Sequence, residues 1–146
     1  MKKISGSYIL VMEALNPTLV QVGKLGEIQL IPGLYYYGGS AKRGLAARIE
    51  RHFKESKKTY WHIDYMTTHP QVDIVEAWCY PDQADIEHQL GGLDDTFLDD
   101  IPRGFGAGDC QSGCAAHLWR AKTQLEPEMI SEDYYIIKHV SKYSSE

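Results

Sequence analysis

The sequence predicts an α+β fold in which a small, mostly antiparallel sheet is flanked by helices. Strand-like runs fill the first part of the chain, helical periodicity follows them, and one further strand lies between the helices. That order of elements is typical of α+β domains. The 146 residues, 43% of them hydrophobic and 24% charged, suit one domain with a modest core.

The first part of the chain contains three strand-forming regions. Residues 4–14 (ISGSYILVMEA) are rich in β-forming side chains and predict a first strand. Residues 18–31 divide around the glycines at 23 and 26, which predicts a hairpin inserted before the next strand. Residues 34–39 (LYYYGG) predict a short aromatic strand, in which Tyr36 points away from its two tyrosine neighbours.

A helix is expected directly after the aromatic strand. Leu45, Ile49 and Phe53 recur every four residues, which predicts one buried stripe. Arg48 and His52 have the same spacing and are expected to stack on an adjacent face of that helix.

The rest of the chain alternates between helical, strand-like and loop-like patterns. The expected elements are a shorter helix over 61–68, a strand over 72–80, a helix over 83–90, a loop-rich stretch over 93–108, a helix or strand around 115–119 and a C-terminal element containing 134–137. We place the domain at residues 1–122. Residues 123–146 are expected to form a C-terminal extension that packs on the same domain.

The shorter helix contains the segment Trp61 to Tyr65 (WHIDY). Trp61 and Tyr65 are four residues apart and are expected in the core. His62 and Asp64 face different sides of a helix, so we interpret them as residues that fix a loop and not as an acid–base pair.

The charges of the chain are unevenly distributed. The chain carries a net charge of −5, but residues 42–58 carry +5, so the remainder carries −10. A basic patch on an acidic body attracts a polyanion locally, whereas a solvated helix face explains the same charges equally well. The residues that we expect to contact nucleic acid through this patch are Lys42, Arg43, Arg51, Lys54, Lys57 and Lys58.

Several features indicate a cytoplasmic protein. The N-terminus lacks the apolar region of a signal peptide, and no apolar stretch approaches the length that spans a membrane. The three cysteines are an odd and small number, which favours reduced thiols over a disulfide framework. No pattern indicates an oligomeric state.

Two tripeptides on the predicted strands resemble motifs of a known nuclease family. Gly6-Ser7-Tyr8 on the first strand and Tyr37-Gly38-Gly39 on the aromatic strand are similar to the two name-giving motifs of the GIY-YIG nucleases. Leu45 and Arg48 are similar to the leucine and arginine on that family's first helix, and His52 follows the arginine by one turn, as in several members. The order of the motifs carries the resemblance. It implies a GIY-YIG-like fold and an endonuclease that hydrolyses phosphodiester bonds in DNA.

A narrower resemblance is to one group of prokaryotic proteins in that superfamily. Some of its members are fused to a base-excision DNA glycosylase, which implies a link to DNA repair. The resemblance covers residues 4–119. The segments that carry it are Tyr35 to Ala41 (YYYGGSA), Arg51-His52, Trp61 to Tyr65, Gly104-Phe105-Gly106, Asp109-Cys110 and His117-Leu118.

The residue types also suit phosphodiester cleavage, which needs an activated water and stabilised charge on the phosphoryl oxygens. Tyr8 and Tyr37, on adjacent strands, are expected near the attacking water and a phosphate oxygen. A free phenol titrates near ~10, so a tyrosine that acts as a base needs cationic neighbours, which Arg48 and His52 supply. An arginine also matches the geometry of a phosphate better than a lysine does. For Tyr36 we accept sheet packing alone.

The resemblance implies a glutamate that binds Mg²⁺ or Mn²⁺ on the helix after the third core strand. In the predicted helix over 83–90, Glu87 takes this position, and Asp85 is the second choice. Glu76 lies in the preceding strand and is interpreted as facing solvent.

Three residues have the ligand types of a structural zinc site. Cys110, Cys114 and His117 supply two thiolates and an imidazole. A fourth ligand would be one of three other histidines, His52, His62 or His88. The alternative is that the thiols pack as small hydrophobic groups.

Three functional hypotheses follow from the sequence. The first is a metal-dependent DNA endonuclease whose catalytic residues are Tyr8, Tyr37, Arg48, His52 and Glu87. The second is a nucleic-acid-binding module of the same fold without efficient catalysis, which the acidic body favours. The third is a zinc-stabilised interaction domain. None of them involves a membrane.

Overall fold

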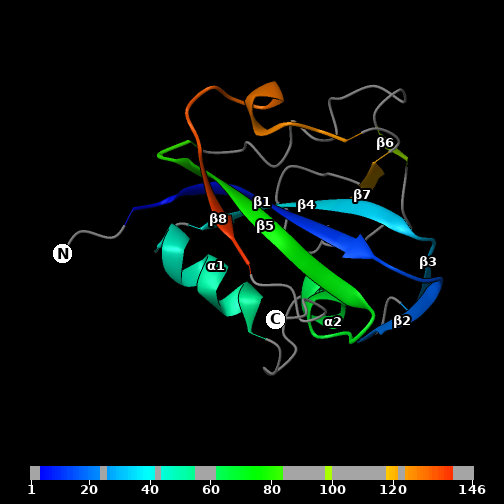
Figure 1. Ribbon diagram of the computed structural model, residues 1–146. Coiled ribbons are helices and arrows are strands. Elements are labelled where there is room, and N and C mark those ends of the chain that lie inside the picture. Colours follow the sequence, from blue (N-terminus) through cyan, green and yellow to red (C-terminus); the bar gives the residue numbers. More distant parts are fainter. Residues whose placement is uncertain are drawn as a thin grey trace, which may run out of the picture.

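Six antiparallel strands form the main sheet, in the order β6-β7-β4-β1-β5-β8 (Figure 1). They belong to a computed structural model that describes residues 4–23, 26–41, 44–54, 62–83, 98–99, 118–121 and 124–139. The strands are β1 (Gly6–Ala14), β4 (Gly33–Ala41), β5 (Val72–Pro81), β6 (Leu98–Asp99), β7 (Leu118–Ala121) and β8 (Tyr135–Lys138). The inserted hairpin consists of β2 (Thr18–Val22) and β3 (Gly26–Leu30). The predicted α+β class with a mostly antiparallel sheet is confirmed.

Strand β1 is covered on both faces. It pairs with β4 on one side and with β5 on the other, and its residues 7–12 are all buried. A strand buried on both faces has a near-continuous apolar run, as the sequence YILVM in β1 illustrates. The side chains of β1 are therefore held in position by a strand on either side.

Different parts of the chain cover the two faces of the sheet (Figure 1). Helices α1 (Leu45–Phe53) and α2 (His62–Thr67) lie on one face, which we call the helix face. The segment 124–134, with the short 3-10 helix η3 (Pro127–Met129), lies on the other, which we call the far face. Because side chains alternate along a strand, Tyr8 and Leu10 of β1 pack on the helix face, and Ile9 packs on the far face.

The three tyrosines of β4 follow the same alternation. Tyr35 and Tyr37 belong to the core of the helix face, and Tyr36 belongs to the core of the far face. The ring of Tyr36 packs 5.4 Å from that of Trp78, and its hydroxyl accepts a hydrogen bond from the backbone N–H of Leu125 at 3.0 Å. The predicted orientation of Tyr36 is thus confirmed, and its role is packing.

The segment 124–139 packs onto the sheet through its own apolar side chains and through β8. Leu125 and Ile130 are buried in the far-face core. The hydroxyl of Tyr80 donates a hydrogen bond to the backbone oxygen of Pro127 at 2.9 Å, and β8 pairs with β5. This segment is therefore an integral layer of the fold.

Helix α1 forms where the apolar periodicity predicts it. Leu45 and Ile49 are buried and Phe53 packs partly buried against the same core. Gly44, with a φ of 142°, precedes the helix, and the backbone N–H of Leu45 donates to the oxygen of Ile4 at 2.7 Å. The start of α1 is thereby tied to the segment that leads into β1.

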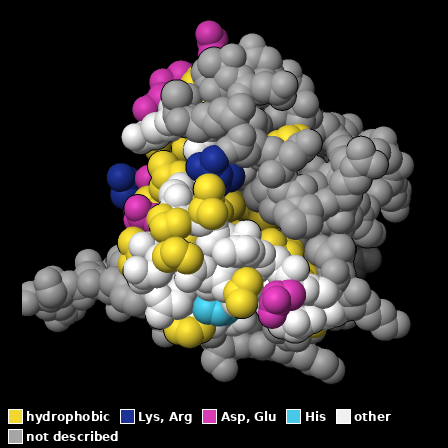
Figure 2. Space-filling model, turned by 90° about the vertical axis from the view of Figure 1, so that its right-hand side faces the viewer, with side chains coloured by type: hydrophobic (Ala, Val, Ile, Leu, Met, Phe, Trp, Pro, Cys, Tyr) yellow, Lys and Arg dark blue, Asp and Glu magenta, His cyan; other side chains and the backbone are white. Residues whose placement is uncertain are grey.

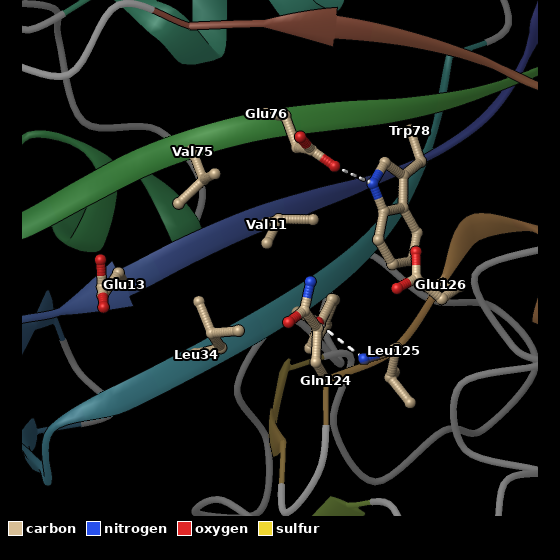
Figure 3. Close-up of a pocket in the computed structure, with 10 residues that line it drawn as sticks. Val11, Glu13, Leu34, Val75, Glu76, Trp78, Gln124, Leu125 and Glu126 are labelled. Atoms are coloured by element: carbon tan, nitrogen blue, oxygen red, sulfur yellow. Dashed lines mark hydrogen bonds between the residues drawn. The ribbon is translucent and has the colours of Figure 1, made fainter.

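Strand β5 contains a β-bulge opposite β1. Val11 pairs with Glu76 and Met12 pairs with Ile74, so Val75 has no register partner on β1. The extra residue turns both Val75 and Glu76 toward the far face (Figure 3).

Some predicted elements differ from the structure or lie outside its described residues. The short strand β6 lies inside the stretch predicted to be loop-rich, because it pairs with β7, a distant segment that a local pattern cannot identify. The stretch around 115–119, predicted as helix or strand, contributes residues 118 and 119 to β7. Residues 84–90 of the predicted third helix lie outside the described residues. In the described part of the chain, no helix has the length and apolar character needed to cross a membrane.

Candidate active site

A hydrogen-bonded tyrosine–histidine pair lies between the sheet and α1. The hydroxyl of Tyr8 lies 2.7 Å from Nε2 of His52, and the two ring centroids are 5.2 Å apart. Tyr8 is 2% exposed and His52 is 0% exposed. A phenol and an imidazole at this distance share a proton, and which atom donates depends on the tautomer of the histidine. The pair can therefore relay a proton.

The glycines of the two tripeptides make room for this pair. A Cβ on Gly39 would lie 2.5 Å from the hydroxyl oxygen of Tyr8 and 2.6 Å from its Cζ, so the phenol lies directly over the backbone of β4. A Cβ on Gly6 would overlap the backbone oxygen of Tyr80 on β5. A side chain at Gly39 would therefore overlap the phenol of Tyr8, and one at Gly6 would overlap the backbone of β5.

Tyr37 lies on the same face of the sheet as Tyr8, on the neighbouring strand β4. Gly39 is the register partner of Tyr8, and Leu10 is the partner of Tyr37, so the two tyrosines are diagonal neighbours on adjacent strands. Tyr37 is 3% exposed. The structure thus brings both predicted tyrosines to the helix face.

The two arginines of α1 have different partners. Nη1 of Arg48 donates to the backbone oxygen of Ser40 at 2.9 Å, and Ser40 is the register partner of Ser7, next to Tyr8. Arg51 instead forms a bidentate ion pair with Asp64 of α2, with Nη1–Oδ1 and Nη2–Oδ2 distances of 2.9 Å each. Arg48 therefore holds α1 to the end of β4, and Arg51 holds α1 to α2.

Arg51 directly precedes His52 on α1. Its pKa is raised above the usual value mainly by the hydrogen bond to Asp64, partly opposed by desolvation. His52 contacts the phenol of Tyr8. Two successive residues of α1 are thus bound to Asp64 of α2 and to Tyr8 of β1.

Asp64 is the site residue that the sequence interpretation missed. Its side chain is completely buried, and both its oxygens are bound by Arg51. We interpreted the polar residues of this helix as fixing a loop. A carboxylate next to two apolar helix positions was the available signal, because a buried carboxylate requires a cation.

Several predicted site residues lie outside the described part of the chain. Lys54 ends α1 and is exposed, as a basic contact requires. The predicted residues outside the described ranges are Lys42, Arg43, Lys57, Lys58, Asp85, Glu87, Cys110, Cys114 and His117.

The described part of the site does not by itself form a metal centre. Among the described residues, no three histidine, cysteine, aspartate or glutamate side chains gather in a way that could hold a metal ion. The carboxylate of Asp64 is bound by Arg51 through both oxygens.

A pocket of about 200 Å³ lies on the far face of the sheet (Figure 3). The charged residues among its described lining are three glutamates, Glu13, Glu76 and Glu126. Glu76, which we expected to face solvent, accepts a hydrogen bond from Nε1 of Trp78 and is 18% exposed beside Lys138 at 3.7 Å. An acidic wall repels phosphate, so this pocket is unsuited to a nucleic-acid backbone.

The hairpin side of the molecule is also unsuited to phosphate. Three exposed hydrophobic residues lie in or beside β2 and β3, namely Leu15, Leu19 and Ile31. Figure 2, which views this side, shows hydrophobic side chains among acidic and basic ones in the described part. Among the described residues, the arginines of α1 are therefore better suited to contact a polyanion.

Cys79 of β5 is not a nucleophile. It is fully buried, and this burial raises the pKa of its thiol to about 11, partly opposed by a hydrogen bond with Tyr135. The thiolate is the reactive form, so at neutral pH this side chain acts as a small core residue.

Replacing Gly39 with alanine should disrupt the site from the backbone side. The new Cβ would overlap the phenol of Tyr8, so we expect a loss of about 1–3 kcal/mol in the free energy of unfolding. Urea unfolding of Gly39→Ala measures this cost. In a Tyr8→Leu background, where the overlapping phenol is absent, the same substitution should cost much less. An equal cost in both backgrounds would contradict the steric explanation.

The chain matches the model of one protein family over most of its length. Residues 7–137 match the model of the family described as "Domain of unknown function DUF123", a GIY-YIG-like family. The matched region runs from β1 to β8 and includes the tyrosine–histidine pair and the Arg51–Asp64 ion pair. No curated protein and no solved structure matches the chain. Because the match covers most of the chain, the protein belongs to the DUF123 family.

Proposed function

We propose that this protein is a metal-dependent endonuclease that hydrolyses phosphodiester bonds in DNA. The observation that carries the proposal is the hydrogen bond between Tyr8 and His52, which directly follows Arg51 on α1. Membership of a GIY-YIG-like family supports the same class of reaction. Fusion of a base-excision glycosylase to members of the group that this chain resembles makes nicked or damaged DNA a substrate class to include in the test.

The tyrosine–histidine pair would activate the attacking water. As the water attacks phosphorus, its proton passes to the hydroxyl oxygen of Tyr8, and the phenolic proton passes to Nε2 of His52. This relay needs the phenol and the imidazole in direct contact, which their 2.7 Å separation provides. It also leaves Tyr8 neutral throughout, so no free phenolate has to form.

The two arginines would stabilise the charge on the phosphoryl oxygens. Both are only partly buried, in contrast to Tyr8 and His52, so a phosphate would reach the pair from the side of the guanidinium groups. Guanidinium donors are suited to phosphate oxygens because of their planar geometry. Glu87 would hold the Mg²⁺ or Mn²⁺ ion, whose charge would help the leaving oxygen to depart.

Cleavage of defined DNA substrates tests this proposal. The full chain is incubated with branched, nicked, single-stranded and double-stranded DNA, in Mg²⁺, in Mn²⁺ and in EDTA. Cleavage should require the metal, and Arg48→Ala should lower its rate by about 10²-fold, because one donor to the developing charge is lost. Lys138→Ala, which removes a cation next to the far face, is the matched control and should leave the rate unchanged.

Binding without cleavage is the second candidate function. The near-complete burial of Tyr8 and Tyr37 favours it, because a catalytic phenol must meet water. If the wild-type chain binds these DNAs but leaves them intact in both metals, the protein is a nucleic-acid-binding module. If cleavage occurs and survives both Arg48→Ala and Glu87→Ala, the site is located elsewhere.

A further inference from the structure

The most deeply buried charge near the candidate site is the carboxylate of Asp64. It is 0% exposed, whereas its partner Arg51 is 29% exposed. Both oxygens accept hydrogen bonds from Arg51, from Nη1 and from Nη2, each at 2.9 Å. Two parallel bonds fix the plane of a guanidinium as well as its position. Asp64 therefore determines how Arg51 is oriented.

The orientation of Arg51 matters because the next residue on α1, His52, contacts Tyr8. The Nε2 atom of His52 lies 2.7 Å from the hydroxyl of Tyr8. Asp64 reaches across from α2, a different helix. The ion pair thus connects α2 to the place where the proton relay would occur.

The ion pair also limits what Arg51 can do at long range. Its two charges are opposite and in direct contact, so their fields largely cancel at distances well beyond their 2.9 Å separation. A cation that attracts DNA from a distance should instead be exposed, as Lys54 is at the end of the same helix. Arg51 is accordingly better suited to a short-range contact than to the general basic patch in which the sequence placed it.

We propose that Asp64 is a positioning residue that holds Arg51 as a short-range contact for the single phosphodiester being cleaved, beside the Tyr8–His52 pair. This inference rests on the proposed function. It separates two roles within the basic segment: Arg51 acts on the reacting phosphate, and exposed lysines such as Lys54 attract the polyanion. Loss of Asp64 should therefore change turnover and not the affinity for DNA.

A split between turnover and binding is the expected result for Asp64→Asn. Its turnover number should fall by about 10²-fold, as small misplacements of a positioning group do. Its dissociation constant for a double-stranded oligonucleotide in EDTA should stay the same or decrease, because the variant gains one positive charge. Glu76→Gln is the matched control: it makes the same change of charge in the ion pair of the far face, so its turnover number should stay that of the wild type.

The double variant Arg51→Gln/Asp64→Asn separates positioning from a purely structural link between the helices. It removes both charges, so its unfolding midpoint should recover most of what Arg51→Gln alone loses. If its turnover stays about 10²-fold low despite the recovered stability, Arg51 has a role in turnover beyond linking the helices, as the proposal requires. If turnover returns with stability, the ion pair is only a structural link and the proposal fails.

A measurement that needs no cleavage distinguishes failure of this inference from failure of the proposed function. The Nε–Hε signal of Arg51 in ¹⁵N NMR spectra should be sharp in the wild type and should shift when a 5′-phosphorylated oligonucleotide is added in EDTA. In Asp64→Asn the signal should broaden and the shift should be lost. If the wild-type signal does not respond while the protein cleaves DNA normally, this inference is wrong and the proposed function stands. If no DNA is cleaved and the signal still responds in the wild type alone, the endonuclease proposal fails, and the positioning of Arg51 toward a phosphate is supported.

Discussion

Tyr8→Phe should lower the rate of DNA cleavage by about 10²- to 10⁴-fold, the usual contribution of a positioned proton-transfer group. The ring that packs over Gly39 is retained, so the core of the helix face should stay intact. The substitution removes the hydrogen bond to His52, at a cost of about 1 kcal/mol in the free energy of unfolding. Single-turnover rates and urea unfolding measure the two effects separately.

Tyr36→Phe is the matched control for this substitution. It also removes one buried hydroxyl, which accepts a hydrogen bond from Leu125, but on the far face of the sheet. Its stability should change by a similar amount, and its cleavage rate should be that of the wild type. If both variants lose the same fraction of activity, the loss reports on the fold, and Tyr8 has no role in proton transfer.

Arg51→Leu should produce the largest loss of stability at the site, about 3 kcal/mol in the free energy of unfolding. The reason is the burial of Asp64, whose carboxylate would be left in the protein interior without its bidentate cation. The cost should lie at the lower end of the range for buried ion pairs, because Arg51 is 29% exposed. Urea unfolding at neutral pH measures it.

An exposed ion pair provides the comparison. Lys138 is 80% exposed and lies 3.7 Å from Glu76, so Lys138→Leu should change the free energy of unfolding by less than about 1 kcal/mol. The difference between the free-energy cost of Arg51→Leu and that of Lys138→Leu then isolates the effect of burial. Equal costs would indicate that Asp64 is well solvated when Arg51 is absent.

The strands and the first helix could be predicted because each depends on a period within a short segment. The alternation of Tyr35, Tyr36 and Tyr37 and the stripe of Leu45 and Ile49 are both local patterns, and the structure agrees with them. Strand β6, in contrast, has two residues and exists through its pairing with β7. No local period can identify an element of that kind.

The site was predicted less completely for a related reason. The resemblance selected Tyr8 and His52, but only the fold shows that they are in contact. Helical spacing grouped Arg48 with His52, and the fold shows that Arg48 contacts Ser40 whereas Arg51 pairs with Asp64. The role of Asp64 was predicted from the faces of α2, its own helix, whereas its partner Arg51 lies on α1.

The β-bulge of β5 has a consequence for how sequences of this family should be aligned. Val75 is the residue without a register partner, so a chain that lacked it would have a regular strand, with Ala77 still toward the helices and Trp78 still toward the C-terminal layer. Loss of a residue farther along the strand would exchange these two directions and place an indole under α1. A one-residue gap between relatives is therefore expected at positions 75 and 76, and an alignment that opens it between 77 and 81 would pair side chains from opposite sides of the sheet.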